Sequence, residues 1–305
     1  MKETVLDTVY TPEWRERLRQ YYDRPAMQNY WAFDFDRIWA KHKKGVEGQK
    51  GMARLVSNWM NLENARVLVI GSYLGAEAIA YALCGARVVG IDLDEEALEL
   101  SRELTQRYGL DIDIQCLDGA DTGFPDASFD YISCAQVLEH LPPERQPVML
   151  KEIWRMLKPG GLVWIDTPNQ HSFKDSHDTG LPFIHWLPRS MKIPLARKLG
   201  RSVSAKEPAF EFEEVHLHYY LSYFQLRRIL RGLGQHEVLS IYRGFGNMEQ
   251  YAAERQRQGR GKGPVFKAKV VMLGGVLRVW NHSWFNDMRL MICKCPAAGD
   301  GKTNS

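Results

Sequence analysis

One stretch of the chain limits its possible folds more than any other. Residues 67–71 read Val-Leu-Val-Ile-Gly, which is typical of a buried strand that ends in a glycine turn, and Gly75 follows shortly after. An apolar helical segment is expected from Ala76, and residues 88–92 read Val-Val-Gly-Ile-Asp, a second strand that ends in a carboxylate. Strand, glycine turn, helix and strand together predict the first βαβ unit of a parallel sheet.

The position of Asp92 indicates what this unit binds. An acid about twenty residues beyond the glycine turn can accept hydrogen bonds from both hydroxyls of a ribose. Glycines let the backbone approach a ligand closely, and the helix start offers unpaired amide donors. We therefore expect an adenosine-containing cofactor here. The residues expected to contact it at this unit are Gly71, Ser72, Gly75, Asp92 and Leu93.

Further motifs follow in a fixed order. They are Asp118-Gly119, a run from Phe124 to Ile132, Val137-Leu138-Glu139-His140-Leu141, and Lys158-Pro159-Gly160-Gly161. In this order and spacing they resemble the class I S-adenosylmethionine-dependent methyltransferases, in the small-molecule branch that includes the ubiquinone-biosynthesis methyltransferases. The resemblance covers residues 62–170 well and residues 215–242 more loosely. A nicotinamide oxidoreductase is disfavoured, because a dinucleotide site needs the spacing GxGxxG and the position of its third glycine is occupied by Ala78.

The resemblance implies S-adenosyl-L-methionine as the cofactor and assigns further residues to it. Asp118 matches the family aspartate that hydrogen-bonds the adenine amino group, and Gly119 follows it. Ala135 and Gln136 stand at the end of the fourth strand, where the family lines the methionine moiety.

Two departures from the family pattern affect this site. Val69 stands where the family usually has an acid, which often anchors the amino group of the cofactor. Tyr73 replaces the middle glycine of the turn and hinders close approach, unless its ring turns away or stacks on the cofactor. A non-catalytic binding module that kept the fold while its cofactor site degraded is therefore the alternative function.

The hydrophobic pattern predicts the rest of the sheet. Strands are expected over residues 66–70, 87–92, 112–116, 131–134, 162–165, 238–242 and 289–295. Asp94 is expected to cap one helix, and Ser222 with Gln225 to form the capping box of another. A helix beginning near Pro147 is expected to stop at Lys158-Pro159-Gly160-Gly161. The result is an α/β, Rossmann-like, doubly wound and mostly parallel seven-stranded sheet, whose last strand is antiparallel as the resemblance implies.

The remaining segments are expected to be additions to this sheet. Residues 1–60 are aromatic and charged, and we interpret them as an N-terminal helical cap over the cofactor cleft. Residues 61–297 would be the methyltransferase domain, and residues 298–305 a disordered tail. Two insertions, 171–214 after strand five and 243–288 after strand six, are expected to bind the substrate, because long loops at the carboxyl edge of a sheet commonly carry specificity.

Methyl transfer requires alignment of the nucleophile, the methyl carbon and the sulfur, and exclusion of water. If the acceptor is a hydroxyl, a base must take its proton, and histidine suits that role near neutral pH. The candidates are His140, which matches the Leu-Glu-His of the family, and His171, His177 and His218. Histidines scattered through a loop are more often acid/base groups than metal ligands, so no metal is expected.

Composition supports a cytoplasmic enzyme that does not bind nucleic acid. The net charge of +3 is too small to argue for a nucleic-acid partner, and the chain lacks an Asn-Pro-Pro-Tyr-like tetrad for a flipped base. Five cysteines, an odd number, suit a reducing compartment. We expect no signal peptide, since Met1-Lys2-Glu3 is followed by polar residues. The longest apolar run, Val270–Leu277, is far shorter than a membrane span.

Two basic segments bear on the acceptor. Residues 189–206 contain no acid, and the basic residues of 255–269 precede the apolar run 270–273 and Trp280. Each segment is compatible with a solvated loop. The combination also describes a patch that rests on an anionic membrane, which predicts peripheral membrane contact through residues 255–285 and a position at the membrane surface. The expected acceptor is a small molecule, a sugar or another glycan, or a lipid-linked compound; the oligomeric state is left open.

Overall fold

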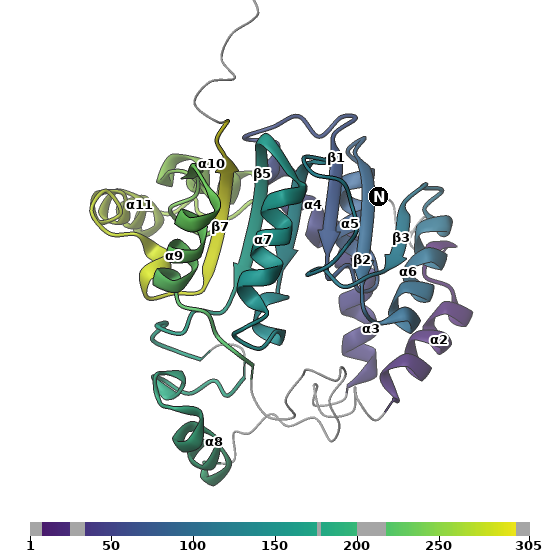
Figure 1. Ribbon diagram of the computed structural model, residues 1–305, viewed down its shortest axis with the longest axis horizontal. Helices are drawn as coiled ribbons and strands as arrows, with labels where there is room; N and C mark the ends of the chain where they lie inside the picture. Colours follow the sequence, from purple (N-terminus) through teal and green to yellow (C-terminus); the bar gives the residue numbers. More distant parts are fainter. Residues whose placement is uncertain (1–7, 25–33, 176–177, 200–217, 297–305) are drawn as a thin grey trace, which may run out of the picture.

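The computed structural model describes residues 8–24, 34–175, 178–199 and 218–296 (Figure 1). At its centre is a seven-stranded sheet with the order β3-β2-β1-β4-β5-β7-β6. The strands are β1 (Arg66–Ile70), β2 (Arg87–Asp92), β3 (Asp113–Cys116), β4 (Phe129–Ala135), β5 (Leu157–Thr167), β6 (His236–Val238) and β7 (Met288–Lys294). β7 runs antiparallel to β5 and β6, and the other neighbours are parallel. The predicted doubly wound sheet with an antiparallel last strand is confirmed.

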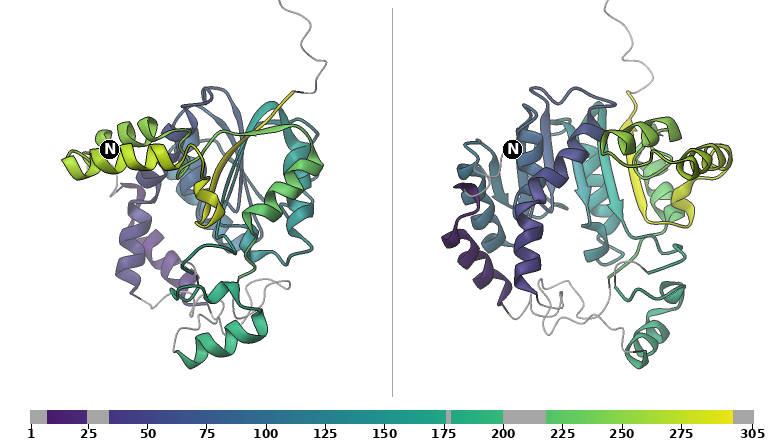
Figure 2. Two further views of the ribbon diagram at one scale, coloured as in Figure 1. Left: turned by 90° about the vertical axis from the view of Figure 1, so that its left-hand side faces the viewer. Right: turned by 180° about the vertical axis from the view of Figure 1, so that it is seen from behind.

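Helices cover both faces of this sheet (Figures 1 and 2). They are α2 (Pro12–Tyr22), α3 (Phe35–Lys43), α4 (Gly45–Val56), α5 (Ala76–Ala82), α6 (Glu95–Arg107), α7 (Gln146–Met156), α8 (Arg189–Lys198), α9 (Tyr223–Leu233), α10 (Met248–Arg257) and α11 (Pro264–Val276), with the short 3-10 turns η1 (Leu138–His140), η2 (Ile184–Trp186) and η3 (His282–Trp284). Among the described residues, none of these helices is long and apolar enough to cross a bilayer.

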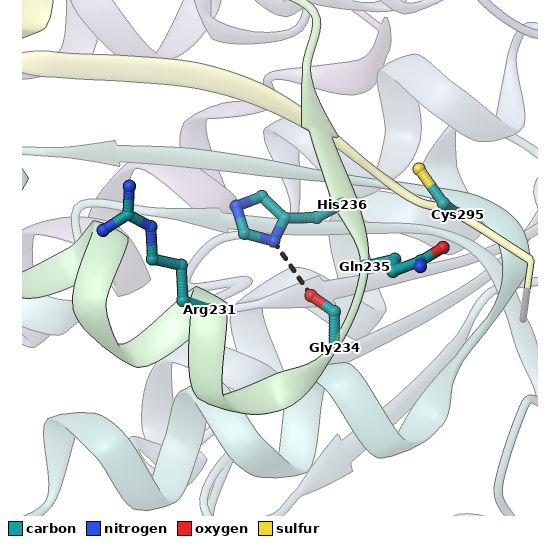
Figure 3. Close-up of a pocket in the computed structure, with 5 residues that line it drawn as sticks. All are labelled: Arg231, Gly234, Gln235, His236 and Cys295. Atoms are coloured by element: carbon teal, nitrogen blue, oxygen red, sulfur yellow. Dashed lines mark hydrogen bonds between the residues drawn. The ribbon is translucent and has the colours of Figure 1, made fainter.

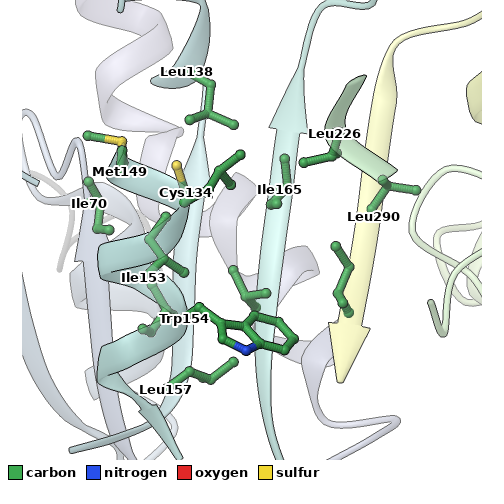
Figure 4. Packing of buried hydrophobic residues seen from close by; sticks show 14 of the residues in the cluster. Ile70, Cys134, Leu138, Met149, Ile153, Trp154, Leu157, Ile165, Leu226 and Leu290 are labelled. Carbon is green, nitrogen blue, oxygen red and sulfur yellow. The ribbon is translucent and has the colours of Figure 1, made fainter. Parts of the chain in front are cut away.

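β1 explains why the sequence shows a continuous apolar run rather than an alternating one. Leu68 and Ile70 pack with residues of α7 and α9 on one face, and Figure 4 shows Ile70 beside Met149 in this cluster. Val67 and Val69 pack on the other face, in the cluster that includes residues of α4 and α5. Because helices cover both faces, every position of a central parallel strand must be apolar.

Two predicted boundaries were wrong for identifiable reasons. β5 begins at Leu157 rather than at residue 162, because Leu157 pairs with Phe129 before the register shifts. β6 ends at Val238 rather than at residue 242. Ser240 Oγ donates to Arg289 O at 2.9 Å and accepts from Met291 N at 3.0 Å, so a side chain takes over hydrogen bonds that the strand ladder would make.

The predicted helix caps are confirmed. Asp94 accepts from Ala97 N at 3.2 Å at the start of α6. Ser222 and Gln225 form the reciprocal capping box of α9.

The N-terminal helices are attached to the first βαβ unit through α6. Trp14 Nε1 donates to Leu100 O at 3.4 Å, and Tyr21 OH donates to Asp94 Oδ2 at 2.8 Å. Arg24 also pairs with Asp94, with 2.6 Å between Nη2 and Oδ2. The residues 1–60 that the structure describes are thus largely helical, as predicted, and they share one hydrophobic cluster with the βαβ unit.

Candidate cofactor and acceptor site

The turn between β1 and α5 requires glycine at two positions. Gly71 and Gly75 have φ angles of 71° and 80°, in the left-handed region that side chains disfavour. A Cβ atom at Gly71 would lie 2.5 Å from Val137 Cγ2, and one at Gly75 would overlap Ser101 Oγ. The glycines that the sequence singled out therefore shape the turn itself.

Asp92 lies at the end of β2, directly against this turn. Its Oδ2 accepts from Tyr73 N at 2.8 Å, and its Oδ1 accepts from Leu93 N at 2.7 Å and from Asp94 N at 3.2 Å. Burial raises the pKa of this carboxyl, whereas the three backbone hydrogen bonds oppose the shift. A carboxylate offers about four lone-pair directions. A ribose hydroxyl would therefore meet the open direction on Oδ2, and a second hydroxyl would compete with the long bond from Asp94 N.

Tyr73 turns its ring toward the N-terminal helices. Its φ angle is 48°, and its hydroxyl donates to Tyr22 OH at 2.7 Å. Tyr22 OH lies 2.8 Å from His42 Nε2, and the ring centroids of Tyr21 and Tyr73 are 5.8 Å apart. The ring thus turns away toward α2, which is one of the two arrangements expected for a tyrosine in this turn; the other was stacking on the cofactor. The position that departs from the family pattern is thus the contact between the turn and the helices α2 and α3.

The histidine in this contact predicts a pH dependence of stability. Burial lowers the pKa of His42 to about 4, from an ordinary value of 6.5, so the imidazole is neutral and accepts from Tyr22. In the unfolded chain His42 takes up a proton near pH 6.5. Keeping His42 neutral therefore costs no stability above pH 6.5, but below this pH the unfolded chain gains a proton that the folded protein does not bind. The free energy of unfolding falls for this reason as the pH drops toward 4. We expect the loss at pH 4.5 to be about 2 kcal/mol, measured as the free energy of unfolding in urea.

A pair of variants isolates this effect from other acid-sensitive groups. His42→Gln keeps an acceptor for Tyr22 but cannot titrate, so its unfolding free energy should fall less between pH 7.5 and pH 4.5 than that of the unmodified protein. His236→Gln, at the start of β6, serves as the control and should behave like the unmodified protein. An equal fall in all three proteins would exclude His42 as the source.

The other cofactor residues follow β3 and β4. Asp118 forms an ion pair with Arg145 and accepts from Ala120 N at 2.9 Å, so its carboxylate already has partners, and its adenine contact stays a prediction. A Cβ at Gly119 would lie 2.8 Å from Ile70 Cγ2, which makes this glycine a packing requirement. Ala135 ends β4, and Gln136 follows with a φ angle of 58°.

All of these segments meet at one edge of the sheet. The turn after β1, the ends of β2, β3 and β4, and η1 all follow the carboxyl ends of adjacent parallel strands. Chain connections from β1 and from β4 leave in opposite directions, so this edge contains the topological switch point where α/β proteins bind ligands.

Sequence reasoning missed two acids at this site. Asp166 lies near the end of β5, where its Oδ1 accepts from Gln136 Nε2 at 3.2 Å and burial raises its pKa to about 6. Glu77, in the first turn of α5, accepts from Ser133 Oγ at 2.6 Å, and burial raises its pKa. Acidic residues in a first helical turn and at a strand end were the available signals, but both are common in unrelated surroundings.

The carboxylate of Glu77 lies on the same face of the sheet as the side chain of Val69. Ser133, which donates to Glu77, is the β-ladder partner of Val69. Side chains of paired residues project to the same face of a sheet, so the carboxylate of Glu77 lies on the face to which position 69 points. Position 69 of β1 carries no acid, but the carboxylate of Glu77, from α5, lies on the same face of the sheet.

Two of the four candidate histidines come together. The rings of His140 and His218 lie edge to face, with centroids 4.5 Å apart. His218 Nδ1 is 2.5 Å from Asp178 Oδ1, and Asp178 is almost fully buried. His171 lies apart from this pair, with its ring 5.9 Å from that of Phe224. His177 lies outside the described residues.

Gln146 holds the histidine pair in place. Its side-chain nitrogen donates to three carbonyl oxygens, those of Leu138, Leu141 and Tyr219, at 3.0, 3.2 and 2.9 Å. Tyr219 N also donates to Glu139 O at 2.8 Å. These bonds fasten the segment after His218 to η1, and the buried network fixes how His218 approaches His140.

Within the described ranges, no group of three or more His, Cys, Asp or Glu side chains is arranged to hold a metal ion. A hollow of about 590 Å³ lined by Arg231, Gly234, Gln235, His236 and Cys295 lies elsewhere (Figure 3). The hollow lies at the start of β6. Because β7 is antiparallel to both β5 and β6, β6 runs in the same direction as β5, and its start lies at the edge of the sheet opposite to the carboxyl ends of the parallel strands. We assign it no part in the site.

Comparison with known proteins agrees with this geometry. Residues 68–165 match the family model described as a methyltransferase domain. A ubiquinone biosynthesis O-methyltransferase from Coxiella burnetii is 30% identical over 119 residues, which are 39% of this chain and 50% of that protein. A probable S-adenosylmethionine-dependent methyltransferase from Mycolicibacterium smegmatis is 36% identical over 115 residues, 38% of this chain and 42% of that protein. The chain thus aligns with about half the length of these curated relatives.

Solved structures of methyltransferases are similar at a lower level. An S-adenosylmethionine-dependent methyltransferase from Mesorhizobium loti has 15% identity and a TM-score of 0.49, covering 81% of this chain and 99% of that one. Magnesium protoporphyrin IX methyltransferase from Synechocystis PCC 6803 has 16% identity and a TM-score of 0.47, covering 96% of this chain and 100% of that one. Similarity at this level says nothing about substrates. From the ordered motifs, the family match and the strand order, residues 68–165 form a methyltransferase domain of the class I S-adenosylmethionine-dependent family.

Proposed function

We propose that the protein is an S-adenosylmethionine-dependent methyltransferase that methylates an oxygen of a small-molecule, sugar or lipid-linked acceptor. The observation that supports this most is the position of the Asp178–His218 pair beside η1. The pair lies at the same sheet edge as the glycine turn and Asp92, where a base for the acceptor would be needed.

The residues at the turn fit the cofactor. Gly71 and Gly75 keep the turn tight, because side chains at these positions would clash with Val137 and Ser101. Ser72 Oγ is buried without a hydrogen-bond partner among the described residues, which is the state expected of a group reserved for a ligand. In this proposal Asp92 holds the ribose, the turn from Gly71 to Gly75 lies under the methionine part, and Ala135 and Gln136 line its other side.

Glu77 is proposed to replace the acid that is missing at position 69. Its carboxylate lies beside Ser133 on the face to which Val69 points, and an ammonium group is the natural partner of a half-buried carboxylate. The cofactor's amino group would therefore be held from α5 rather than from β1.

When bound, the cofactor supplies an activated methyl group on a sulfonium. The task of the protein is to orient the acceptor oxygen, exclude water and remove a proton. Asp178 accepts from Nδ1 of His218, which fixes the tautomer and leaves Nε2 as the basic nitrogen. We propose that Nε2 of His218 takes the acceptor's proton, and that the ring of His140 keeps His218 in position.

Two measurements test this proposal. Calorimetry with S-adenosylhomocysteine should give a dissociation constant in the micromolar range. Incubation of the protein with methyl-labelled cofactor and a cell extract should transfer label to a product, and mass spectrometry should show the addition of one CH₂ unit at an oxygen. Binding without labelling would favour the non-catalytic module, and no binding even at millimolar ligand would contradict both functions.

A further inference from the structure

The second insertion forms a helical pair at the edge of the molecule. α11 packs on α10 through a stripe of apolar residues that contact Met248 and Tyr251; the stripe comprises Phe266, Val270 and Leu273. In Figure 1 α11 lies at the left-hand extremity, and the left view of Figure 2 shows α11, η3 and α8 on the side that faces the viewer. One face of α11 is therefore used within the protein.

The opposite face of α11 is apolar and exposed. By helical geometry, Val265, Val271, Met272 and Val276 lie on one arc of α11, away from the stripe that packs on α10. Val265 is 81% exposed, Val271 77% and Met272 63%. Scattered exposed apolar residues need no explanation, but a contiguous apolar stripe marks an interaction surface.

Basic side chains border this stripe on both sides. Helical geometry places Lys267 beside Val271 on one side of it and Lys269 beside Val276 on the other, Arg278 follows the end of the helix, and all three basic residues are exposed. Residues 255–286 contain no Asp or Glu. The exposed surface of this helix is therefore apolar in the middle and positive at its borders, and these two features together complement an anionic membrane surface.

The apolar surface continues beyond α11 into an aromatic patch, formed by Trp280, Phe285, Phe173, Phe183 and Trp186. Ring contacts connect its members: Trp280–Phe285 at 5.3 Å, Phe285–Phe173 at 5.6 Å, Phe173–Trp186 at 6.3 Å and Trp186–Phe183 at 5.1 Å between centroids. Phe173, Phe183 and Trp186 are each about half exposed. The patch joins the two insertions into one surface, and aromatic rings of this kind favour the boundary between lipid and water.

We propose that α11 and the aromatic patch form a docking surface for an anionic lipid bilayer. The apolar stripe and the patch enter the headgroup boundary, and the bordering lysines and arginine contact lipid phosphates. Neither interaction would suffice alone, because stable membrane attachment generally takes an apolar and an electrostatic contribution together. The proposal does not depend on the chemistry of the candidate site.

Vesicle co-sedimentation tests the proposal on the full chain. The protein should bind vesicles that contain phosphatidylglycerol and bind pure phosphatidylcholine vesicles at least about tenfold more weakly, with affinity falling as salt is added. Val265→Glu combined with Met272→Glu should weaken binding at least about tenfold. Lys267→Glu combined with Lys269→Glu should do the same, because each basic residue near an anionic surface contributes about fivefold.

The matched control is Val148→Glu, which changes a 51% exposed valine on α7, outside the proposed surface. It should leave vesicle binding unchanged. All variants should keep the thermal midpoint and the S-adenosylhomocysteine affinity of the unmodified protein, which separates a lost surface from a lost fold or cofactor site. Equal binding by the α11 variants and the control would overturn the proposal. So would a dimer in light scattering that the Val265→Glu, Met272→Glu protein no longer forms, because the surface would then be covered by a second copy.

Discussion

The Asp92→Asn variant is expected to bind S-adenosylhomocysteine about 100-fold more weakly than the unmodified protein. The carboxylate is surrounded by three backbone N–H groups and has an open acceptor direction on Oδ2. An amide in its place turns an NH₂ group toward a donor, either a backbone N–H or the ribose hydroxyl. A hydrogen bond to a charged group contributes about 1.5–3 kcal/mol, and about 3 kcal/mol corresponds to the predicted factor. Isothermal calorimetry measures it directly.

Asp113→Asn provides the matched control for this variant. Asp113 is an exposed aspartate at the other end of a neighbouring strand, β3, so its change removes the same charge without touching the turn. Its S-adenosylhomocysteine affinity should be that of the unmodified protein. If Asp92→Asn folds normally and also stays within about threefold of the unmodified affinity, the assignment of the ribose site is wrong.

The His218→Gln variant is expected to transfer labelled methyl groups about 100-fold to 10,000-fold more slowly, with unchanged affinity for S-adenosylhomocysteine. This range is what a positioned general base contributes. Asp178→Asn should lower the rate through the tautomer of His218, because an amide no longer fixes which ring nitrogen carries the proton. The readout is the initial rate of labelling of one purified acceptor fraction at saturating cofactor.

The rate profile against pH separates a base from a structural residue. In the unmodified protein the rate should depend on pH, and this dependence should disappear in His218→Gln. A purely structural role would instead lower the thermal midpoint and the cofactor affinity together. His236→Gln, far from the site at the start of β6, should retain the full rate and the full profile. Labelling by His218→Gln at the unmodified rate would remove the histidine from the mechanism.

The βαβ unit of the candidate cofactor site could be predicted from the sequence because it is local. The apolar run of β1, the glycines of the turn and Asp92 belong to one continuous unit, and helix and strand periodicity place them without tertiary information. The backbone conformation of the turn requires glycine at positions 71 and 75, and the two glycines can be recognised in the sequence.

The acceptor half could be predicted only as a set of candidates. His140 and His218 were both named, but their contact depends on Gln146 fastening two segments that are distant in the sequence. Likewise, the raised pKa of Asp166 arises from its burial beside Gln136, and the nearness of Glu77 to position 69 arises from strand pairing. Such properties belong to the packed structure, because burial and approach are set by elements that periodicity does not relate to one another.

The aromatic contact between Tyr73 and the N-terminal helices helps to determine the smallest part of this chain that can fold by itself. Trp14 and Leu18 of α2 cover the apolar side of Leu100 and Ile79, within the region that carries all the recognisable motifs. A chain trimmed to residues 68–165 would therefore expose a wide apolar area and aggregate. Expression and engineering must keep the leading helices, because the smallest recognisable region and the smallest foldable region are different pieces of this polypeptide.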